Sequence, residues 1–423
     1  MARLAVALEK PRLRASDARH GGAWRRNPWT VAVLVLLFYA LWSAAFFAAG
    51  HDARDLSFIG KRFLEQSHAS SVISVDPTYR YYPDQVGYDG QWAYYLALDP
   101  PNARYYMDKP AYRYTRILYP MTARLLAFGR PALIPYTLLL VNLLALAGGT
   151  LAVAAWLKRK GITPWLALIY GLYPGLLLSL QHDLNEPLAY ALLALAVYLF
   201  DFGGRRRLIY AGLAFALAIL ARETTAVFAV LYGLALLAPR PFSGVGAQLA
   251  NARLWKPSRA RLIQAATLLS ISLAPALFYR LFLRLWLGNA DVPADVVPEL
   301  IPFRGILSYW PWQGPQIIAA ATVIAPALIC AAVGIRALWR RLWRVEVFIL
   351  LANVQLFVVM LAADSFPDMA SSARVTASVV PAALFCLPTF DTLTRRNRTW
   401  LLAAAGLWLA LLPWLLASNF YYW

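Results

Sequence analysis

Acidic, basic and aromatic residues gather in one polar stretch of the chain, residues 84–120, which begins DQVGYDGQWAYYLALDP. The stretch carries four aspartates. One of them, Asp89, lies between Gly87 and Gly90, and these glycines permit a tight turn that would present its carboxylate. Because no histidine or cysteine accompanies it, the carboxylate suits general-base catalysis on a hydroxyl or an amine.

Three shorter polar segments interrupt the apolar sequence that follows, at residues 181–187, 222–223 and 364–374. Ionisable groups at membrane depth are costly and therefore predict a functional site. Arginines suit a phosphate or pyrophosphate through forked hydrogen bonds, and apolar walls suit a lipid tail, so together they predict transfer from a lipid-phosphate donor. Besides Asp89, the candidate site residues are Arg113, Arg116, His182, Asp183, Glu186, Arg222, Glu223 and Arg374.

The composition places most of the chain in lipid. Hydrophobic residues make up 61% of the 423 residues and charged residues 14%, and the mean hydropathy is +0.53. Soluble domains carry about 25% charged residues. The net charge of +19 comes from short basic runs between apolar spans, a pattern that orients a membrane protein and argues against nucleic acid as a partner.

The apolar runs predict an all-α polytopic membrane protein with about eleven transmembrane helices. Basic clusters recur in alternate connections, which places the N-terminus in the cytoplasm and the C-terminus outside. The predicted spans are 29–50, 132–157, 162–180, 188–202, 208–221, 224–238, 262–279, 317–338, one ending near 363, one between 374 and 395, and 400–417.

Two domains follow from this pattern: a basic cytoplasmic tail, residues 1–28, and a single transmembrane domain, residues 29–423. An outer loop at 51–130 holds two candidate interfacial helices, 55–66 and 111–129. The runs 208–221 and 224–238 are too short to cross about 30 Å of hydrocarbon. We therefore expect them to re-enter, with Arg222 and Glu223 at a recessed tip below an outward-facing cavity.

The layout resembles the GT-C superfamily of integral-membrane glycosyltransferases, which use polyprenyl-phosphate sugars. Residues 87–100 resemble the motif in its first outer loop, and 182–199 resemble its second acidic motif. Residues 220–228 and 372–385 are similar to its later arginine segments. The resemblance implies that Asp89 is the catalytic base, that Asp183 and Glu186 form the second acidic pair, and that Arg374 faces the carrier phosphate.

Many members of that superfamily place the first acidic residue soon after the first span, where this chain has Asp52 and Asp55. The choice among Asp52, Asp55 and Asp89 therefore stays open, with the flanking glycines favouring Asp89.

The resemblance also implies the partners and the location. The donor is a polyprenyl-phosphate sugar, the acceptor a glycan, lipid or protein, and membrane lipid surrounds the chain. The active site faces the outside of the plasma (inner) membrane. Some relatives require a divalent metal, Mg or Mn, and others none. A lipid-linked-glycan flippase or transporter and a non-catalytic cell-envelope scaffold are the alternative functions, but a flippase would need polar residues along a path across the membrane.

Each candidate residue also has a purely structural interpretation. Asp89 could cap the helix that follows it, and Asp183 with Glu186 could cap the span at 188–202. Arg222 and Glu223 could pair with each other. The remaining cations and the histidine could anchor to lipid head groups, snorkel or simply pack, and these residues are Arg113, Arg116, Arg374 and His182.

Overall fold

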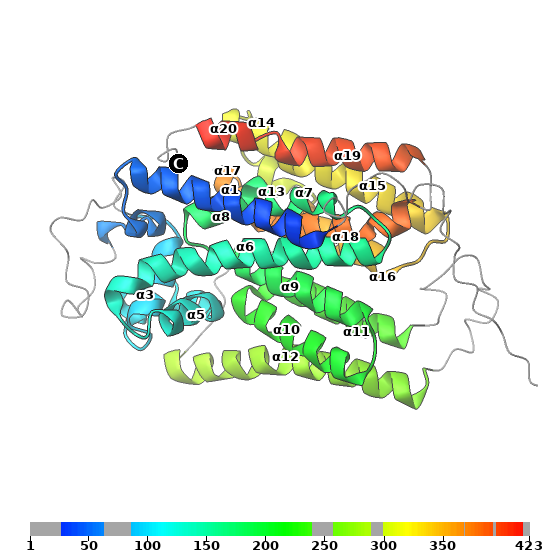
Figure 1. Cartoon of the computed structure of the whole chain (residues 1–423), viewed down its shortest axis with the longest axis horizontal. Helices are drawn as coiled ribbons and strands as arrows, with labels where there is room; N and C mark the ends of the chain where they lie inside the picture. The colour runs from blue at the N-terminus through cyan, green and yellow to red at the C-terminus, as the bar shows by residue number, and fades with distance from the viewer. Residues whose placement is uncertain are drawn as a thin grey trace, which may run out of the picture.

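The computed structural model describes residues 27–62, 86–238, 257–288, 299–367, 369–391 and 395–417, and this described part is helical and contains no strand (Figure 1). Residues 1–26 of the predicted tail (residues 1–28) lie outside the described residues. So do residues 63–66 of the predicted interfacial helix. The longer helices are α1 (Pro28–Ala48), α6 (Ile134–Arg159), α9 (Glu186–Asp201), α10 (Arg205–Ala221), α11 (Ala226–Leu237), α12 (Arg259–Leu287), α15 (Ala325–Trp339), α16 (Val345–Val354), α18 (Val379–Asp391) and α19 (Arg395–Leu409).

Six helical segments in the described residues are long and apolar enough to cross a membrane. The predicted all-α membrane class is therefore confirmed. The six are Pro28–Ala48, Pro131–Arg159, Arg259–Leu287, Gly314–Trp339, Ser371–Phe390 and Thr399–Leu416. Two shorter apolar helices, Glu223–Leu237 and Val345–Val359, accompany them.

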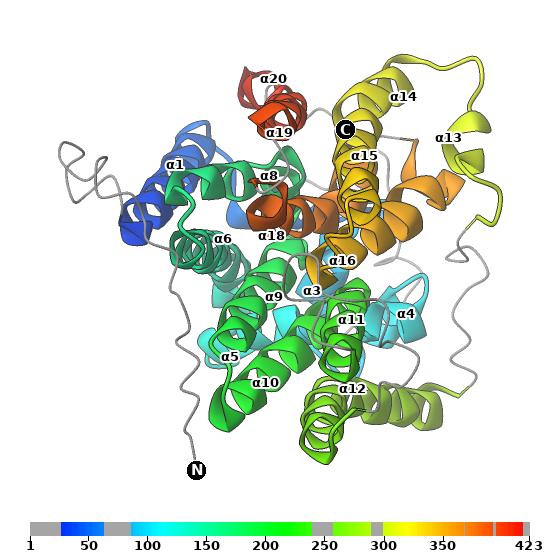
Figure 2. The ribbon, with the colours of Figure 1, turned by 90° about the vertical axis from the view of Figure 1, so that its right-hand side faces the viewer.

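α6 contacts α1 on one side and α9 on the other, and α10 then joins α9 to α12 (Figures 1 and 2). The core between them is apolar and includes the buried side chains of Tyr39, Trp156 and Phe215. Gly149 permits the close packing of α6, since a Cβ there would lie 2.4 Å from the Tyr170 hydroxyl oxygen. Small residues at helix contacts are typical of membrane bundles, where backbones approach closely.

Large apolar side chains cover the outer faces of the bundle. On α12, Phe278 and Leu285 are 71% and 78% exposed, and α1 presents Leu37 and Leu41 to the outside. Apolar surface of this extent is unfavourable in water and favourable in lipid. The outer faces therefore support a membrane location independently of the sequence composition.

The span predicted at 162–180 is wrong as a single helix. The structure divides it into a 3₁₀ turn at Pro164–Ala167 and two short helices, α7 (Leu168–Gly171) and α8 (Pro174–Gln181). Tyr173 is extended, at φ −62° and ψ 125°, because the ring of the next residue, Pro174, disfavours a helical conformation there.

The predicted break at residues 222–223 is present. Arg222 is extended, at φ −157° and ψ 117°, between α10 and α11. The 12 residues of α11 span about 18 Å, less than the hydrocarbon thickness of about 30 Å. α11 is therefore too short to cross the hydrocarbon by itself.

Different polar groups lie at the two ends of the bundle. At one end, Asp201 of α9 pairs with Arg159 and Lys160 at the end of α6. The other end carries the short helices of the first loop (Figure 1), and the predicted interfacial segment 111–129 is indeed mostly helical there. These helices are α3 (Gly90–Leu98), α4 (Pro110–Tyr114) and α5 (Leu118–Leu126); the remaining short helices are α13 (Arg304–Leu307), α14 (Gly314–Ala319), α17 (Met369–Val375) and α20 (Leu412–Ala417).

The contact between the first loop and the turn before α9 requires a glycine at position 90. A Cβ there would lie 2.1 Å from the carbonyl oxygen of His182, so one backbone would have to move. We expect Gly90→Ala to lower the free energy of unfolding by about 1–3 kcal/mol, the usual cost of overpacking. The thermal midpoint of the purified protein measures this.

Gly406→Ala is the matched control, because a Cβ at this helical glycine meets nothing within 4 Å. Its midpoint should stay equal to that of the wild type or rise, since alanine favours helix. Equal midpoints for the two variants would contradict the predicted close contact.

Candidate active site

Charged side chains from four separated parts of the chain meet at the end of the bundle that carries α3 and α5. They enclose a cavity of about 40 Å³, partly lined by Trp92, Leu96 and Pro120. The predicted site residues that line it are Asp89, Arg113, Arg116, Asp183 and Arg374. Glu186, Arg222 and Glu223 join them through ion pairs, whereas His182 does not line the cavity.

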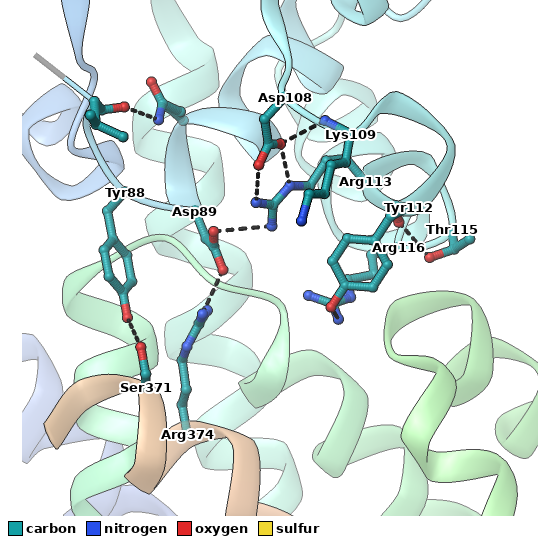
Figure 3. Close-up of polar contacts among 12 residues, drawn as sticks. Tyr88, Asp89, Asp108, Lys109, Tyr112, Arg113, Thr115, Arg116, Ser371 and Arg374 are labelled. Atoms are coloured by element: carbon teal, nitrogen blue, oxygen red, sulfur yellow. Dashed lines mark hydrogen bonds and ion pairs between the residues drawn. The ribbon is translucent and has the colours of Figure 1, made fainter. Parts of the chain in front are cut away.

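Asp89 is held between two arginines (Figure 3). Its Oδ2 accepts a hydrogen bond from Arg374 Nη2 at 2.5 Å, and its Oδ1 lies 3.0 Å from Arg113 Nη1. It occupies the N-cap position of α3 but makes no side-chain capping hydrogen bond, so the capping interpretation is wrong. The carboxylate instead links the first loop to α17, near the end of the chain.

The electrostatics of this site keep Asp89 ionised. Burial alone would raise the pKa of its carboxyl, but the charges of Arg113 and Arg374 outweigh burial and hold the pKa well below its usual range. Arg113 also forms a fork with Asp108, through Nε at 2.9 Å and Nη2 at 3.0 Å. Arg113 is therefore shared by two carboxylates.

Behind Asp89, the two glutamates of the site, Glu186 and Glu223, each have their own arginine. The buried Glu186 carboxylate accepts a hydrogen bond from Arg222, and Arg374 Nη1 lies 3.9 Å from the same oxygen. Glu223 instead pairs with Arg116, whose Nη2 lies 2.9 Å from Oε1. The interpretation that Arg222 and Glu223 form an ion pair with each other is therefore wrong, because each faces a different partner.

Asp183 differs from the other carboxylates because it has no arginine in contact. It is fully buried, and its Oδ2 accepts a hydrogen bond from the Ser57 hydroxyl at 2.7 Å. Within the described residues, its Oδ1 has no hydrogen-bond partner. Burial raises the pKa of Asp183 to about 8, which favours the neutral acid at pH 7.

Asp183 also adopts an unusual backbone conformation, with φ at +48°. Such a conformation costs free energy for a residue other than glycine, although aspartate tolerates it better than most. It places the carboxyl on the wall of the cavity, next to Asn185, whose side-chain amide donates to the carbonyl of Ala221. The capping interpretation for Asp183 is wrong as well.

His182 has a packing role. Its ring stacks on Phe58, with ring centroids 4.5 Å apart, and lies 4.6 Å from the ring of Tyr88. Its Nδ1 is 2.8 Å from the carbonyl oxygen of Leu178. The histidine therefore joins the first loop to the end of α8 without facing the cavity.

Asp52 and Asp55 lie outside the cavity lining and are engaged locally. They form a reciprocal capping box around the 3₁₀ helix Ala53–Ser57, and Asp55 Oδ2 accepts from the Asp52 backbone nitrogen at 2.7 Å. Asp52 also pairs with Arg54 at 3.1 Å. This geometry favours Asp89 as the acidic residue of the first loop that faces the cavity.

Four residues that contribute to the site lack a clear sequence signal. The Ser57 hydroxyl donates to the carboxyl of Asp183, and the Asn185 amide donates to a backbone carbonyl. Asp108 orients Arg113. The Ser371 hydroxyl lies 3.1 Å from that of Tyr88, beside Asp89 (Figure 3). Asn185, Asp108 and Ser371 lie in segments that the sequence marks as polar, whereas Ser57 does not.

In the described residues, no group of three or more histidine, cysteine, aspartate or glutamate side chains is arranged to hold a metal ion. The carboxylates that approach the cavity are instead paired with arginines or hydrogen-bonded to a hydroxyl.

No family model, curated protein or solved structure matches this chain.

The raised pKa of Asp183 makes stability depend on pH. The unfolded pKa is about 3.9, so the folded protein binds an extra proton at neutral pH. The resulting stabilisation is complete below pH about 4 and is lost as the pH rises through about 8. We expect Asp183→Asn to flatten the fall in thermal midpoint over this range.

Asp52→Asn, which also removes one carboxylate, is the control and should keep the wild-type pH profile. Parallel profiles for the wild type and Asp183→Asn would show that Asp183 is ionised in the folded protein.

The buried pair of Glu186 and Arg222 should be sensitive to the loss of one partner. We expect Glu186→Gln to lower the free energy of unfolding by about 3–5 kcal/mol, because it leaves buried arginine charge uncompensated. In denaturant unfolding, Glu299→Gln should cost at most about 1 kcal/mol, since its partner Arg304 is 62% exposed. Equal losses for the two variants would contradict a tightly held buried pair.

Proposed function

We propose that this chain is an integral-membrane glycosyltransferase that moves a sugar from a polyprenyl-phosphate donor to an acceptor outside the cytoplasm. The observation that carries the proposal is the cavity itself, where Asp89 meets Arg113, Arg116 and Arg374 at one end of an apolar bundle. Arginines in this position can bind the donor phosphate, and the carboxylate can accept a proton from the acceptor.

The membrane arrangement belongs to the same proposal. We propose the eleven-span arrangement in the plasma membrane that the sequence predicts. It consists of the six long apolar segments, α9, α16, the divided segment of α7 and α8, and α10 with α11 as a re-entering pair. Basic groups at the ends of α6 and α15 and at the starts of α10 and α12 support a cytoplasmic location for that side. The cavity then faces outward, within reach of a lipid-linked donor.

The reaction we propose is a direct displacement. Asp89 takes the hydroxyl proton of the acceptor while the acceptor oxygen forms a bond to the anomeric carbon. The bond from that carbon to the phosphate oxygen breaks, and polyprenyl phosphate leaves with the electron pair. A single displacement inverts the anomeric carbon, and the arginines stabilise the charge on the departing phosphate.

The ion pairs of Asp89 suggest how the base becomes active. While Arg113 and Arg374 contact the carboxylate, its pKa is low and it is a weak base. A donor phosphate competes for the same guanidinium groups, and its binding would release Asp89 and raise its pKa.

The test is release of polyprenyl phosphate by the purified protein from a panel of polyprenyl-phosphate sugars, with candidate acceptors supplied. We expect Asp89→Asn to lower turnover by about 10²–10⁴-fold, the usual contribution of a general base. The folded state of the variant is checked by its thermal midpoint and its elution in size-exclusion chromatography.

Asp52→Asn and Asp55→Asn are the controls, because both residues cap a 3₁₀ turn outside the cavity lining. Both should retain most of the turnover. Full turnover by Asp89→Asn would exclude this aspartate as the base. Binding of a lipid-linked glycan without turnover would favour a flippase.

A further inference from the structure

A groove lies at the opposite end of the bundle, between α1, α6 and α9. α6 contacts α1 on one side and α9 on the other (Figure 2). The groove has a volume of about 670 Å³ and contains none of the proposed catalytic residues. The residues that line it include Trp29, Gly148, Ala155, Lys158, Tyr198 and Phe202.

The α6 wall of the groove has the length and polarity of one membrane leaflet. Gly148, Ala152 and Ala155 form a row on a single helix face that continues to Lys158. From Gly148 to Lys158 the helix rises about 15 Å, half of the hydrocarbon thickness of about 30 Å. The wall is therefore apolar over the depth of one acyl chain and cationic where a head group would lie.

The cationic rim has more positive charge than its carboxylate can neutralise. Asp201 pairs with both Arg159 and Lys160. Lys158 is exposed and has no ion-pair partner among the residues that the structure describes. Arg207 adds a further charge, 3.8 Å from the centroid of the Phe202 ring. An anionic head group would complement this rim.

Aromatic side chains lie near the cationic rim of the groove. Trp29 is 63% exposed, and Tyr198 packs edge-on against Phe202 at a centroid distance of 4.8 Å. Tryptophan and tyrosine favour the boundary between hydrocarbon and head groups. The aromatic rings and the cations therefore place the rim of the groove at that boundary.

We propose that this groove binds a membrane phospholipid with an anionic head group, with an acyl chain along Gly148 and Ala155 and the phosphate at Lys158 and Arg207. The site is separate from the proposed transferase reaction and does not depend on it. Its role would be to hold α1 against α6 and α9 at this end of the bundle.

The test measures binding of phosphatidylglycerol and of phosphatidylcholine to the delipidated full-length protein in detergent, by native mass spectrometry. We expect phosphatidylglycerol to bind more tightly. Lys158→Gln should weaken its binding about fivefold, the effect of one basic residue near an anionic lipid. Arg340→Gln, which removes an exposed charge at the end of α15, should leave binding unchanged.

Gly148→Leu tests the apolar part of the groove. A Cβ at Gly148 meets nothing within 4 Å, so the leucine should fill the groove without disturbing the helix. Gly406→Leu is the matched control, because Gly406 is also an exposed helical glycine in open space. Only Gly148→Leu should lose phosphatidylglycerol binding and the rise in thermal midpoint that this lipid causes.

The midpoint of Gly148→Leu in lipid-free detergent should equal that of the wild type, which shows that the variant folds. Equal phosphatidylglycerol binding by the wild type and a folded Gly148→Leu would overturn the proposal. So would preferential binding of polyprenyl phosphate or of phosphatidylcholine at this groove.

Discussion

The ion pairs of Asp89 with Arg113 and Arg374 tie the first loop to the last third of the chain, and the polar end of the bundle is organised around them. Removing charges from water is costly, and one ion pair rarely repays that cost. Here partners are shared: Asp89 contacts two arginines, Arg113 contacts two carboxylates, and Glu186 lies near both Arg222 and Arg374. Each of these shared charges is therefore compensated by two groups of opposite charge.

The same network limits what can bind. Its arginines already face carboxylates. A ligand that enters must therefore replace ion pairs with contacts of equal strength, a requirement that an anionic phosphate satisfies and a neutral sugar does not. Asp183, held by the Ser57 hydroxyl instead of an arginine, is the carboxyl in this cavity whose pKa is raised by burial.

The two ends of the bundle handle charge differently. At the cavity end, Glu186 and Arg222 are buried as a pair, and the other cations and carboxylates are mostly paired with one another while partly exposed. At the opposite end, the side chains of Lys158 and Arg159 are exposed at the end of an apolar groove. Charge is thus compensated by the protein at one end, and by lipid at the other if the groove holds the ligand we propose.

The sequence by itself determined the all-α membrane class and the segments that carry the site, because hydrophobic length and charge are local properties of the chain. It also predicted the break at Arg222. Only the tertiary structure decided the pairings: Arg222 with Glu186, Arg116 with Glu223, and Ser57 with Asp183. Only the structure shows that the span at 162–180 is divided and that Asp89 makes no capping hydrogen bond to α3. The contact between Asp89 and Arg374 joins residues 285 positions apart in the chain, and only the packing of the helices brings such residues together.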